Sequence, residues 1–256
     1  MSLRNLLITI CILIAPLSTV VADSITQQQA NDILSELKEI KLLLRQLANS
    51  DKTLAPSKPI KKLEQAASIP IGDHPYLGKE DAPLILVEYT DYECPYCNRF
   101  NATVLPELKK KYVEKGLLKV VVKDFPLKFH NNAVLAATAA RCAREQGFYW
   151  EMREELFKNA KNLKKETLIK LGARHGPDSK QYLHCLEDTH HDAAIKRDIR
   201  EGRLIGITGT PSFVLGRPDS KGMVKGIRFT GARSLAYFES QLKAVLKEND
   251  IAMTKP

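Results

Sequence analysis

Residues 84–97 read LILVEYTDYECPYC, and this stretch decides the fold. Its first seven residues are mostly apolar or β-branched, which predicts a buried β-strand. The CPYC motif at 94–97 follows where the strand gives way to a helix, expected from about 95 to 114. A second apolar strand, LLKVVVK at 117–123, completes a βαβ unit whose crossover should be right-handed.

The position of CPYC at the start of a helix predicts redox chemistry. Unpaired backbone N–H groups and the helix dipole favour the thiolate of Cys94, and a thiolate is the nucleophile. Cys97 can then attack a mixed disulfide formed at Cys94. Pro95 suits the first helical position, which needs no N–H. Half of a zinc site or a chance pair is the alternative, but Cys142 and Cys185 are too far apart in sequence to form the second close pair of a zinc site.

The rest of this domain has a helical block followed by strands. Residues 127–206 are rich in helix formers, and glycines divide them into separate helices. Strands are predicted at 211–216 and 224–231, before a closing amphipathic helix at 234–247. The expected fold class is α/β, with a helical insertion between a β-α-β half and a β-β-α half.

The strand-CPYC-helix unit, followed after the helical block by a Gly-Thr-Pro turn at 209–211, resembles the DsbA-like branch of the thioredoxin superfamily. The resemblance covers roughly residues 70–250 and implies a thioredoxin fold with a helical insertion. It also implies a cis peptide bond before Pro211, beside the active-site cysteines, and a substrate contact from the backbone of Thr210. Without the resemblance, this turn alone would predict a trans-proline loop.

Glu88 lies six residues before Cys94 in an otherwise apolar strand. Burying a carboxylate is costly, so an acid at this position suggests a use. The resemblance implies that Glu88 assists proton transfer to and from Cys97. A side chain that reaches solvent at a strand edge is the alternative.

Cys142 and Cys185 fall in two predicted helices of the insertion. Four cysteines allow three pairings, and if the CxxC forms one pair these two remain for each other. We therefore expect a structural disulfide, with two buried free thiols as the alternative. The six histidines, including His130 and the adjacent His190 and His191, show no ligand spacing, so no metal or cofactor is assigned.

Residues 1–22 have the features of a cleaved signal peptide: a basic residue, an apolar core and a small-residue cleavage site before Asp23. An uncleaved anchor is the alternative. Cleavage would remove Cys11 and leave four of the five cysteines, an even number in an oxidising compartment. No apolar run reaches the roughly 20 residues that a spanning helix needs. A periplasmic location is expected.

Residues 23–49 are predicted to form an N-terminal oligomerisation helix, because apolar or small residues alternate at spacings of three and four. The seam consists of Ala30, Ile33, Leu37, Ile40, Leu44 and Leu47. Leucine at heptad position a with isoleucine at d favours a trimer or larger assembly over a dimer. A helix that docks on its own domain is the alternative. Residues 50–68, charged and with two prolines, indicate a linker before a domain at 69–256.

These features predict an exported thiol-disulfide oxidoreductase in which Cys94 attacks and Cys97 resolves. The expected partners are unfolded or misfolded secreted proteins and a membrane redox partner. Within the resemblance, CPYC, Thr210 and the N-terminal helix are closer to disulfide-isomerase members than to the monomeric oxidase. The direction of the chemistry depends on redox potential, which the sequence does not give.

A thiol-based copper-binding or holdase protein, using the same cysteines without turnover, is the rival function. Nucleic-acid binding is not expected, although the formal net charge is +9. The lysines lie among helix formers with interspersed glutamates, which is typical of solvated helix faces.

Overall fold

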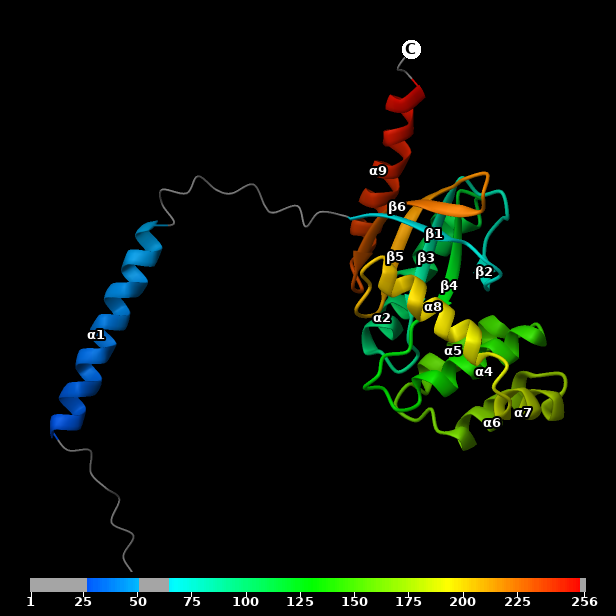
Figure 1. Cartoon of the computed structure of the whole chain (residues 1–256), viewed down its shortest axis with the longest axis horizontal. Coiled ribbons are helices and arrows are strands. Elements are labelled where there is room, and N and C mark those ends of the chain that lie inside the picture. Colours follow the sequence, from blue (N-terminus) through cyan, green and yellow to red (C-terminus); the bar gives the residue numbers. More distant parts are fainter. Residues whose placement is uncertain (1–26, 51–64, 254–256) are drawn as a thin grey trace, which may run out of the picture. The chain divides into compact units, whose positions relative to one another are not determined.

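The computed structural model describes residues 27–50 and 65–253, which fall into two units (Figure 1). Helix α1 (Gln27–Ser50) belongs to the first unit, and the other described elements belong to the second. The expected signal peptide and most of the expected linker lie outside the described residues. Within the described part of the chain, no helix is long and apolar enough to span a membrane.

Helix α1 covers most of the predicted N-terminal helix and contains neither glycine nor proline. Three residues of the predicted seam, Ile33, Leu37 and Ile40, are 49%, 55% and 52% exposed. Leu34, which flanks the seam, is also exposed. The helix therefore presents an apolar stripe to its surroundings.

The second unit is built on a six-stranded sheet with strand order β1-β6-β5-β3-β4-β2. The two strands of the βαβ unit, β3 (Leu84–Thr90) and β4 (Leu118–Asp124), are neighbours in the sheet and run parallel. β5 (Ser212–Pro218) is antiparallel to β3, and β6 (Met223–Thr230) is antiparallel to β5. Every residue of β3 and β4 is buried, as expected for strands covered on both faces.

Two edge strands were not predicted. β1 (Gln65–Pro70) pairs with β6, and the short β2 (Tyr76–Leu77) pairs with β4. The linker boundary is therefore corrected, because residues 65–68 belong to the sheet. The sequence of β1, QAASIP, is small and polar, and its alternating burial arises from contact with a strand far along the chain.

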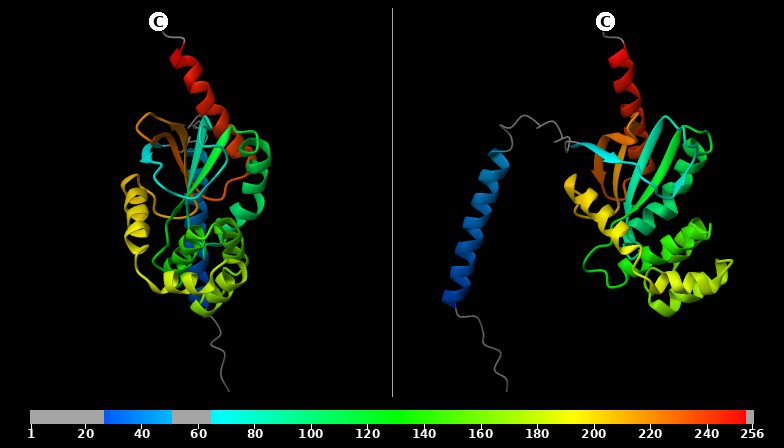
Figure 2. Two further views of the ribbon diagram at one scale, coloured as in Figure 1. Left: turned by 90° about the vertical axis from the view of Figure 1, so that its right-hand side faces the viewer. Right: turned by 45° about the vertical axis from the view of Figure 1, so that its right-hand side comes forward.

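Helices cover both faces of the sheet (Figure 2). α2 (Pro95–Thr103) and α9 (Leu235–Met253) pack on one face, where Phe100 and Phe238 both contact Phe213 of β5. α8 (Asp192–Leu204) packs on the other face. The alternation of side chains along β3 directs Leu86 and Glu88 toward the α2 face and Val87 toward the α8 face.

The helix expected at 95–114 consists of three consecutive segments. α2 is followed by α3 (Leu105–Leu108) and by a π-helical turn, η1 (Lys109–Val113). Pro106 lies in the first turn of α3, and its missing N–H breaks the hydrogen-bond ladder from α2. The first segment, α2, is therefore only nine residues long.

The helical insertion gathers at the end of the sheet where β3 leads into α2 (Figure 1). Its first four helices are α4 (Ala133–Glu145), α5 (Tyr149–Lys158), α6 (Lys165–His175) and α7 (Ser179–Glu187). The first helix begins at Ala133 rather than at residue 127, because the preceding loop is held by Asp91. The Asp91 carboxylate accepts a hydrogen bond from Leu127 N–H at 2.8 Å and lies 2.8 Å from His130 Nδ1.

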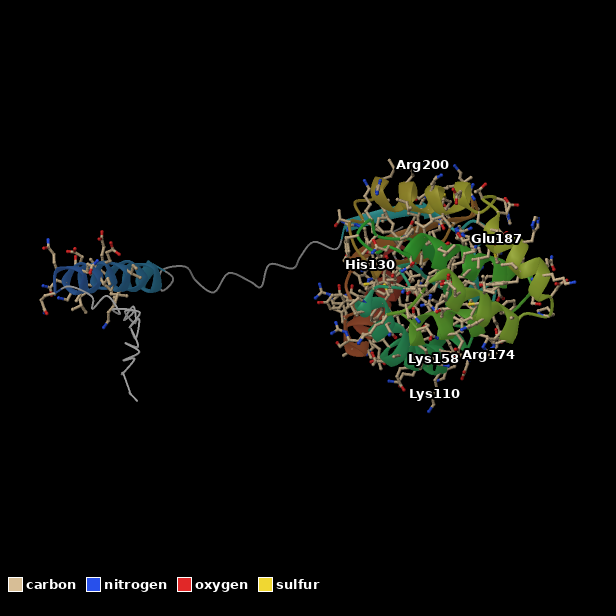
Figure 3. The ribbon with its side chains drawn as sticks, turned by 90° about the horizontal axis from the view of Figure 1, so that it is seen from below. Lys110, His130, Lys158, Arg174, Glu187 and Arg200 are labelled. Atoms are coloured by element: carbon tan, nitrogen blue, oxygen red, sulfur yellow. A yellow bond between two sulfur atoms is a disulfide. The ribbon has the colours of Figure 1, made fainter. Side chains whose placement is uncertain are left out.

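Surface ion pairs link the insertion helices to one another. Arg174 of α6 lies 3.9 Å from a carboxylate oxygen of Glu155 of α5. Within α5, Lys158, a neighbour of Arg174 in Figure 3, lies 2.9 Å from the other carboxylate oxygen of Glu155. Lys165 of α6 pairs with Glu187 of α7. Exposed pairs of this kind add little stability, so the buried core of the insertion carries most of it.

Candidate active site

The CPYC motif lies at the N-terminus of α2. Cys94 is the N-cap residue, with extended backbone angles, and its N–H donates to the Asp91 carbonyl at 3.1 Å. Pro95 occupies the first turn, where its missing N–H costs nothing. Both thiols are free and buried: Cys94 is 3% exposed and Cys97 is 0% exposed. The cysteines also belong to the hydrophobic core of the insertion.

The surroundings shift the pKa values of the two thiols in opposite directions. A hydrogen bond from the Cys97 thiol lowers the pKa of Cys94 to about 6, against the opposing effect of burial. Thr210 and the backbone N–H groups of Tyr96 and Cys97 act in the same direction. Burial raises the pKa of Cys97 well above its ordinary value, and the negative charges of Cys94 and Glu88 add to this rise. At neutral pH, Cys94 is a thiolate and Cys97 a thiol.

The Gly-Thr-Pro turn lies against Cys94. The Thr210–Pro211 peptide bond is cis. In the thiol form, Cys94 Sγ donates to the carbonyl oxygen of Thr210 at 3.4 Å. Ser212, which follows the turn, donates its hydroxyl to the Gly209 carbonyl at 2.6 Å and so fixes the approach to β5.

Glu88 is fully buried, which excludes the alternative of a side chain reaching solvent at a strand edge. Its two carboxylate oxygens accept hydrogen bonds from Arg153 Nη2 of α5, each at 2.9 Å. Arg153 is itself buried, donates from Nε to Asn101 at 3.1 Å, and lies over the ring of Phe157. Glu88 also lies close enough to Cys97 for its charge to raise the pKa of that thiol.

Arg153 is the residue of this site that the sequence reasoning missed. The segment YWEMREELFK resembles an ordinary amphipathic helix with an exposed arginine. Two signals pointed to it indirectly. A buried Glu88 needs a cationic partner, and Arg153 lies four residues before Phe157, on the apolar side of α5.

Cys142 of α4 and Cys185 of α7 are joined by a disulfide. Both residues belong to the core of the insertion, to which the alanines of α4 and Tyr182 of α7 also contribute. The bond therefore ties two packed helices together across 43 residues of chain.

Comparison with known proteins gives the family. A model of the thioredoxin family matches residues 71–222, more than half of the chain. The chain belongs to the thioredoxin family.

Two curated relatives of this thioredoxin-family chain illustrate the range of similar proteins. The probable disulfide bond formation protein D of Bacillus anthracis is 28% identical over 170 residues, covering 59% of this chain and 75% of the relative. The Na(+)/H(+) antiporter NhaA 3 of Salinispora tropica is 32% identical over 137 residues, covering 53% of this chain. The chain spans only 20% of that antiporter's length.

Solved structures show the same fold. Alpha-DsbA1 of Wolbachia pipientis superimposes with a TM-score of 0.63 at 23% identity, covering 72% of this chain and 96% of that one. Oxidised BdbD of Bacillus subtilis gives a TM-score of 0.61 at 21% identity, covering 71% and 97%. The predicted DsbA-like thioredoxin fold with a helical insertion is confirmed.

Proposed function

We propose that this protein is a protein-disulfide oxidoreductase, exported to the periplasm, that acts on unfolded or misfolded secreted proteins. The observation that carries the proposal is the placement of Cys94 as the N-cap of α2, with Cys97 one turn on and the cis Thr210–Pro211 bond against Cys94. The opposite pKa shifts of the two thiols agree with this placement. One thiol is poised as a nucleophile and its partner is held protonated, which is what reversible thiol-disulfide exchange requires.

Cys94 begins the exchange. Its thiolate attacks one sulfur of a substrate disulfide, so that a Cys94–substrate bond forms and the other substrate sulfur leaves as a thiolate. Cys97 then loses its proton and attacks Cys94, which forms the Cys94–Cys97 disulfide and releases the second substrate thiolate. The reverse sequence oxidises a substrate dithiol.

Glu88 is the proposed acceptor and donor of the Cys97 proton. The thiol is fully buried, so bulk water is a poor acceptor, whereas the Glu88 carboxylate is near enough to act on its pKa. Arg153 is a positioning residue that holds this carboxylate by two hydrogen bonds to Nη2.

Thr210 is the proposed backbone contact for substrate. Its carbonyl oxygen accepts a hydrogen bond from the Cys94 thiol, with a distance of 3.4 Å between sulfur and oxygen. A Cys94 thiolate has no proton and cannot donate this hydrogen bond. Activation of Cys94 therefore frees this carbonyl to accept a hydrogen bond from an extended substrate segment.

Disulfide isomerisation is the direction that we favour. The exposed stripe of α1 would assemble several copies, trimeric or larger, so that several CPYC sites engage one misfolded chain repeatedly. A membrane redox partner would keep the cysteines in the state that isomerisation needs. Export is supported by the character of residues 1–22 and by the disulfide between Cys142 and Cys185.

The test is refolding of a test protein with scrambled disulfides, compared among wild type, Cys94→Ala and Cys97→Ala. Cys94→Ala should lose exchange, while Cys97→Ala should accumulate mixed disulfides with substrate. If wild type gave no turnover yet bound Cu⁺ through Cys94 and Cys97, the rival copper-binding function would replace the proposal.

A further inference from the structure

Four potential metal ligands meet in the insertion and take no part in the CPYC chemistry. Glu145 ends α4, Cys185 belongs to α7, and His190 and His191 precede α8. One ligand atom from each lies within 4.8 Å of all the others. Glu187, labelled in Figure 3, is the last residue of α7 and shows where the chain leaves this helix toward the two histidines.

The separations of these ligand atoms lie within about 0.3 Å of those in a tetrahedral zinc site. Glu145 Oε1 lies 3.0 Å from His190 Nε2 and 3.3 Å from His191 Nε2. Cys185 Sγ lies 3.9 Å and 3.5 Å from the same two nitrogens. Zinc bonds of ordinary length to nitrogen, oxygen and sulfur give tetrahedron edges of about 3.3 to 3.6 Å.

A supporting contact orients one of the imidazoles. Asp188 Oδ2 lies 3.3 Å from His190 Nδ1, which directs Nε2 of the same ring toward the cluster. A carboxylate behind a histidine is a common support for metal ligands. An ion pair with Glu145 needs only one imidazole, but here two converge on a single carboxylate oxygen.

A route for an ion to the cluster also exists. Glu145 and His191 form part of the lining of a cavity of about 720 Å³, so the ligand atoms are reached from solvent. His190 and Glu145 are exposed, whereas Cys185 lies beneath them.

In the structure Cys185 is bonded to Cys142, so its sulfur is not a thiolate. We propose that Glu145, His190 and His191 bind Zn²⁺, and that reduction of the Cys142–Cys185 disulfide by a dithiol supplies the Cys185 thiolate as fourth ligand. Tight zinc binding is thereby coupled to the reduced state of this disulfide. The coupling is independent of the CPYC function.

Zinc binding by Cys185 follows reduction of the Cys142–Cys185 disulfide. The dithiol loses two electrons and two protons and becomes a disulfide, while the bond between Cys142 and Cys185 breaks to give two thiols. Zn²⁺ then binds the Cys185 sulfur as a thiolate, and the displaced proton goes to solvent. The oxidation state of zinc does not change.

The first test measures Zn²⁺ affinity by competition with a chromophoric chelator. The full chain from Asp23 carries Cys94→Ser and Cys97→Ser, which removes the CPYC thiols as ligands. The disulfide-bonded protein should bind through three ligands, and the reduced protein about 100-fold more tightly or better. Equal affinities in the two states would overturn the proposed coupling.

Matched variants in the same background test the ligands. His190→Ala with His191→Ala should abolish tight binding, and Asp188→Asn should weaken it by about tenfold. His184→Ala changes an exposed histidine of α7 outside the cluster and should have no effect. Unchanged affinity after loss of both cluster histidines would overturn the site.

A second measurement separates coordination from loss of the cross-link. Cys142→Ser and the Cys142→Ser/Cys185→Ser double variant both lack the disulfide, but only the first keeps the Cys185 thiol. With Co²⁺ as probe, the first should give a tetrahedral visible spectrum with a thiolate charge-transfer band, and the second should lack that band. The same spectrum in both variants would exclude Cys185 as a ligand.

Discussion

Arg153 Nη2 of α5 lies 2.9 Å from each carboxylate oxygen of Glu88 on β3, and both side chains are buried. The pair joins the helical insertion to the central sheet near Cys97, whose pKa is raised mainly by burial and further by the charges of Cys94 and Glu88. A buried ion pair contributes little net stability, but removal of one partner leaves an uncompensated charge. Its position beside a redox thiol therefore suggests a role in the chemistry.

The first prediction separates the contribution of this ion pair to folding stability from the role of Glu88 in proton transfer. Glu88→Gln leaves the Arg153 guanidinium unpaired and should lower the free energy of unfolding by about 3 kcal/mol or more. Glu88→Leu with Arg153→Met removes both charges and should restore most of that stability. The rate at which the double variant resolves mixed disulfides should nevertheless remain about a hundredfold below that of wild type, because the proton acceptor is gone.

Denaturant unfolding measures the change in stability. Rapid mixing measures the rate at which a mixed disulfide on Cys94 decays. Glu154→Gln, an exposed acid one residue from Arg153 on α5, is the control and should change neither quantity. A stable double variant with the wild-type decay rate would make Glu88 a structural residue only.

The second prediction concerns pH. The pKa of Cys94 is lowered to about 6, mainly by the hydrogen bond from Cys97, so alkylation of Cys94 should follow a titration near pH 6. The rate should fall about tenfold for each pH unit below this midpoint and level off above it. Iodoacetamide labelling followed by mass spectrometry measures the profile, with Cys94→Ala as the blank. A midpoint near 8.5, the usual value for a free cysteine, contradicts the proposed activation.

The same shift has a consequence for stability of the reduced protein. The thiolate is favoured in the folded state, where the pKa of Cys94 is about 6, over the unfolded state, where it is about 8.5. The Cys94 thiolate therefore contributes to the free energy of unfolding. This contribution is fully present above about pH 8.5 and is lost as the pH falls through about 6. The difference in stability between reduced wild type and reduced Cys94→Ala should shrink accordingly on acidification.

What the sequence predicted well is local in the chain. The apolar run of β3, the CPYC motif and the start of α2 are contiguous, so their periodicity and spacing carry the structural information. The family and fold followed from that stretch together with the turn at Pro211.

What the sequence did not predict depends on pairing between distant segments. β1 becomes a strand through its hydrogen bonds to β6, more than 150 residues later. Arg153 becomes a site residue only because α5 packs beside β3. His190 and His191 gave no ligand spacing, since Glu145 reaches them from another helix.

The third prediction concerns the disulfide of the insertion. Cys142→Ala with Cys185→Ala should lower the free energy of unfolding by about 3 to 4 kcal/mol in the chain-entropy model, for a sequence separation of 43 residues. Thiol exchange at Cys94 should persist, because the CPYC motif belongs to a different helix, α2. Denaturant unfolding in the presence of a metal chelator measures the loss. Peptide mapping that found both thiols alkylatable in unreduced, denatured wild type would contradict the bond.

The fourth prediction concerns α1 and assembly. Ile33 and Ile40 are exposed and lie at the d positions of the seam, where a charge cannot be buried between helices. Ile33→Asp with Ile40→Asp should therefore convert the assembly to a monomer, as should deletion of residues 23–49. Leu42 is equally exposed but lies at position f, outside the seam, so Leu42→Asp should leave the assembly intact. Light scattering at micromolar concentration distinguishes these states.

The monomeric variants then test the link between assembly and isomerisation. Isomerisation benefits from repeated engagement of one misfolded chain, because a wrong disulfide must be opened before a correct one forms. Oxidation needs only one encounter, and a smaller particle is more accessible to an enzyme that reoxidises the CPYC pair. Monomers should therefore keep thiol exchange, lose isomerase activity and be oxidised more readily. A monomeric wild type would refute the assembly itself, whereas an unchanged isomerase rate in a truly monomeric variant would refute only its functional role.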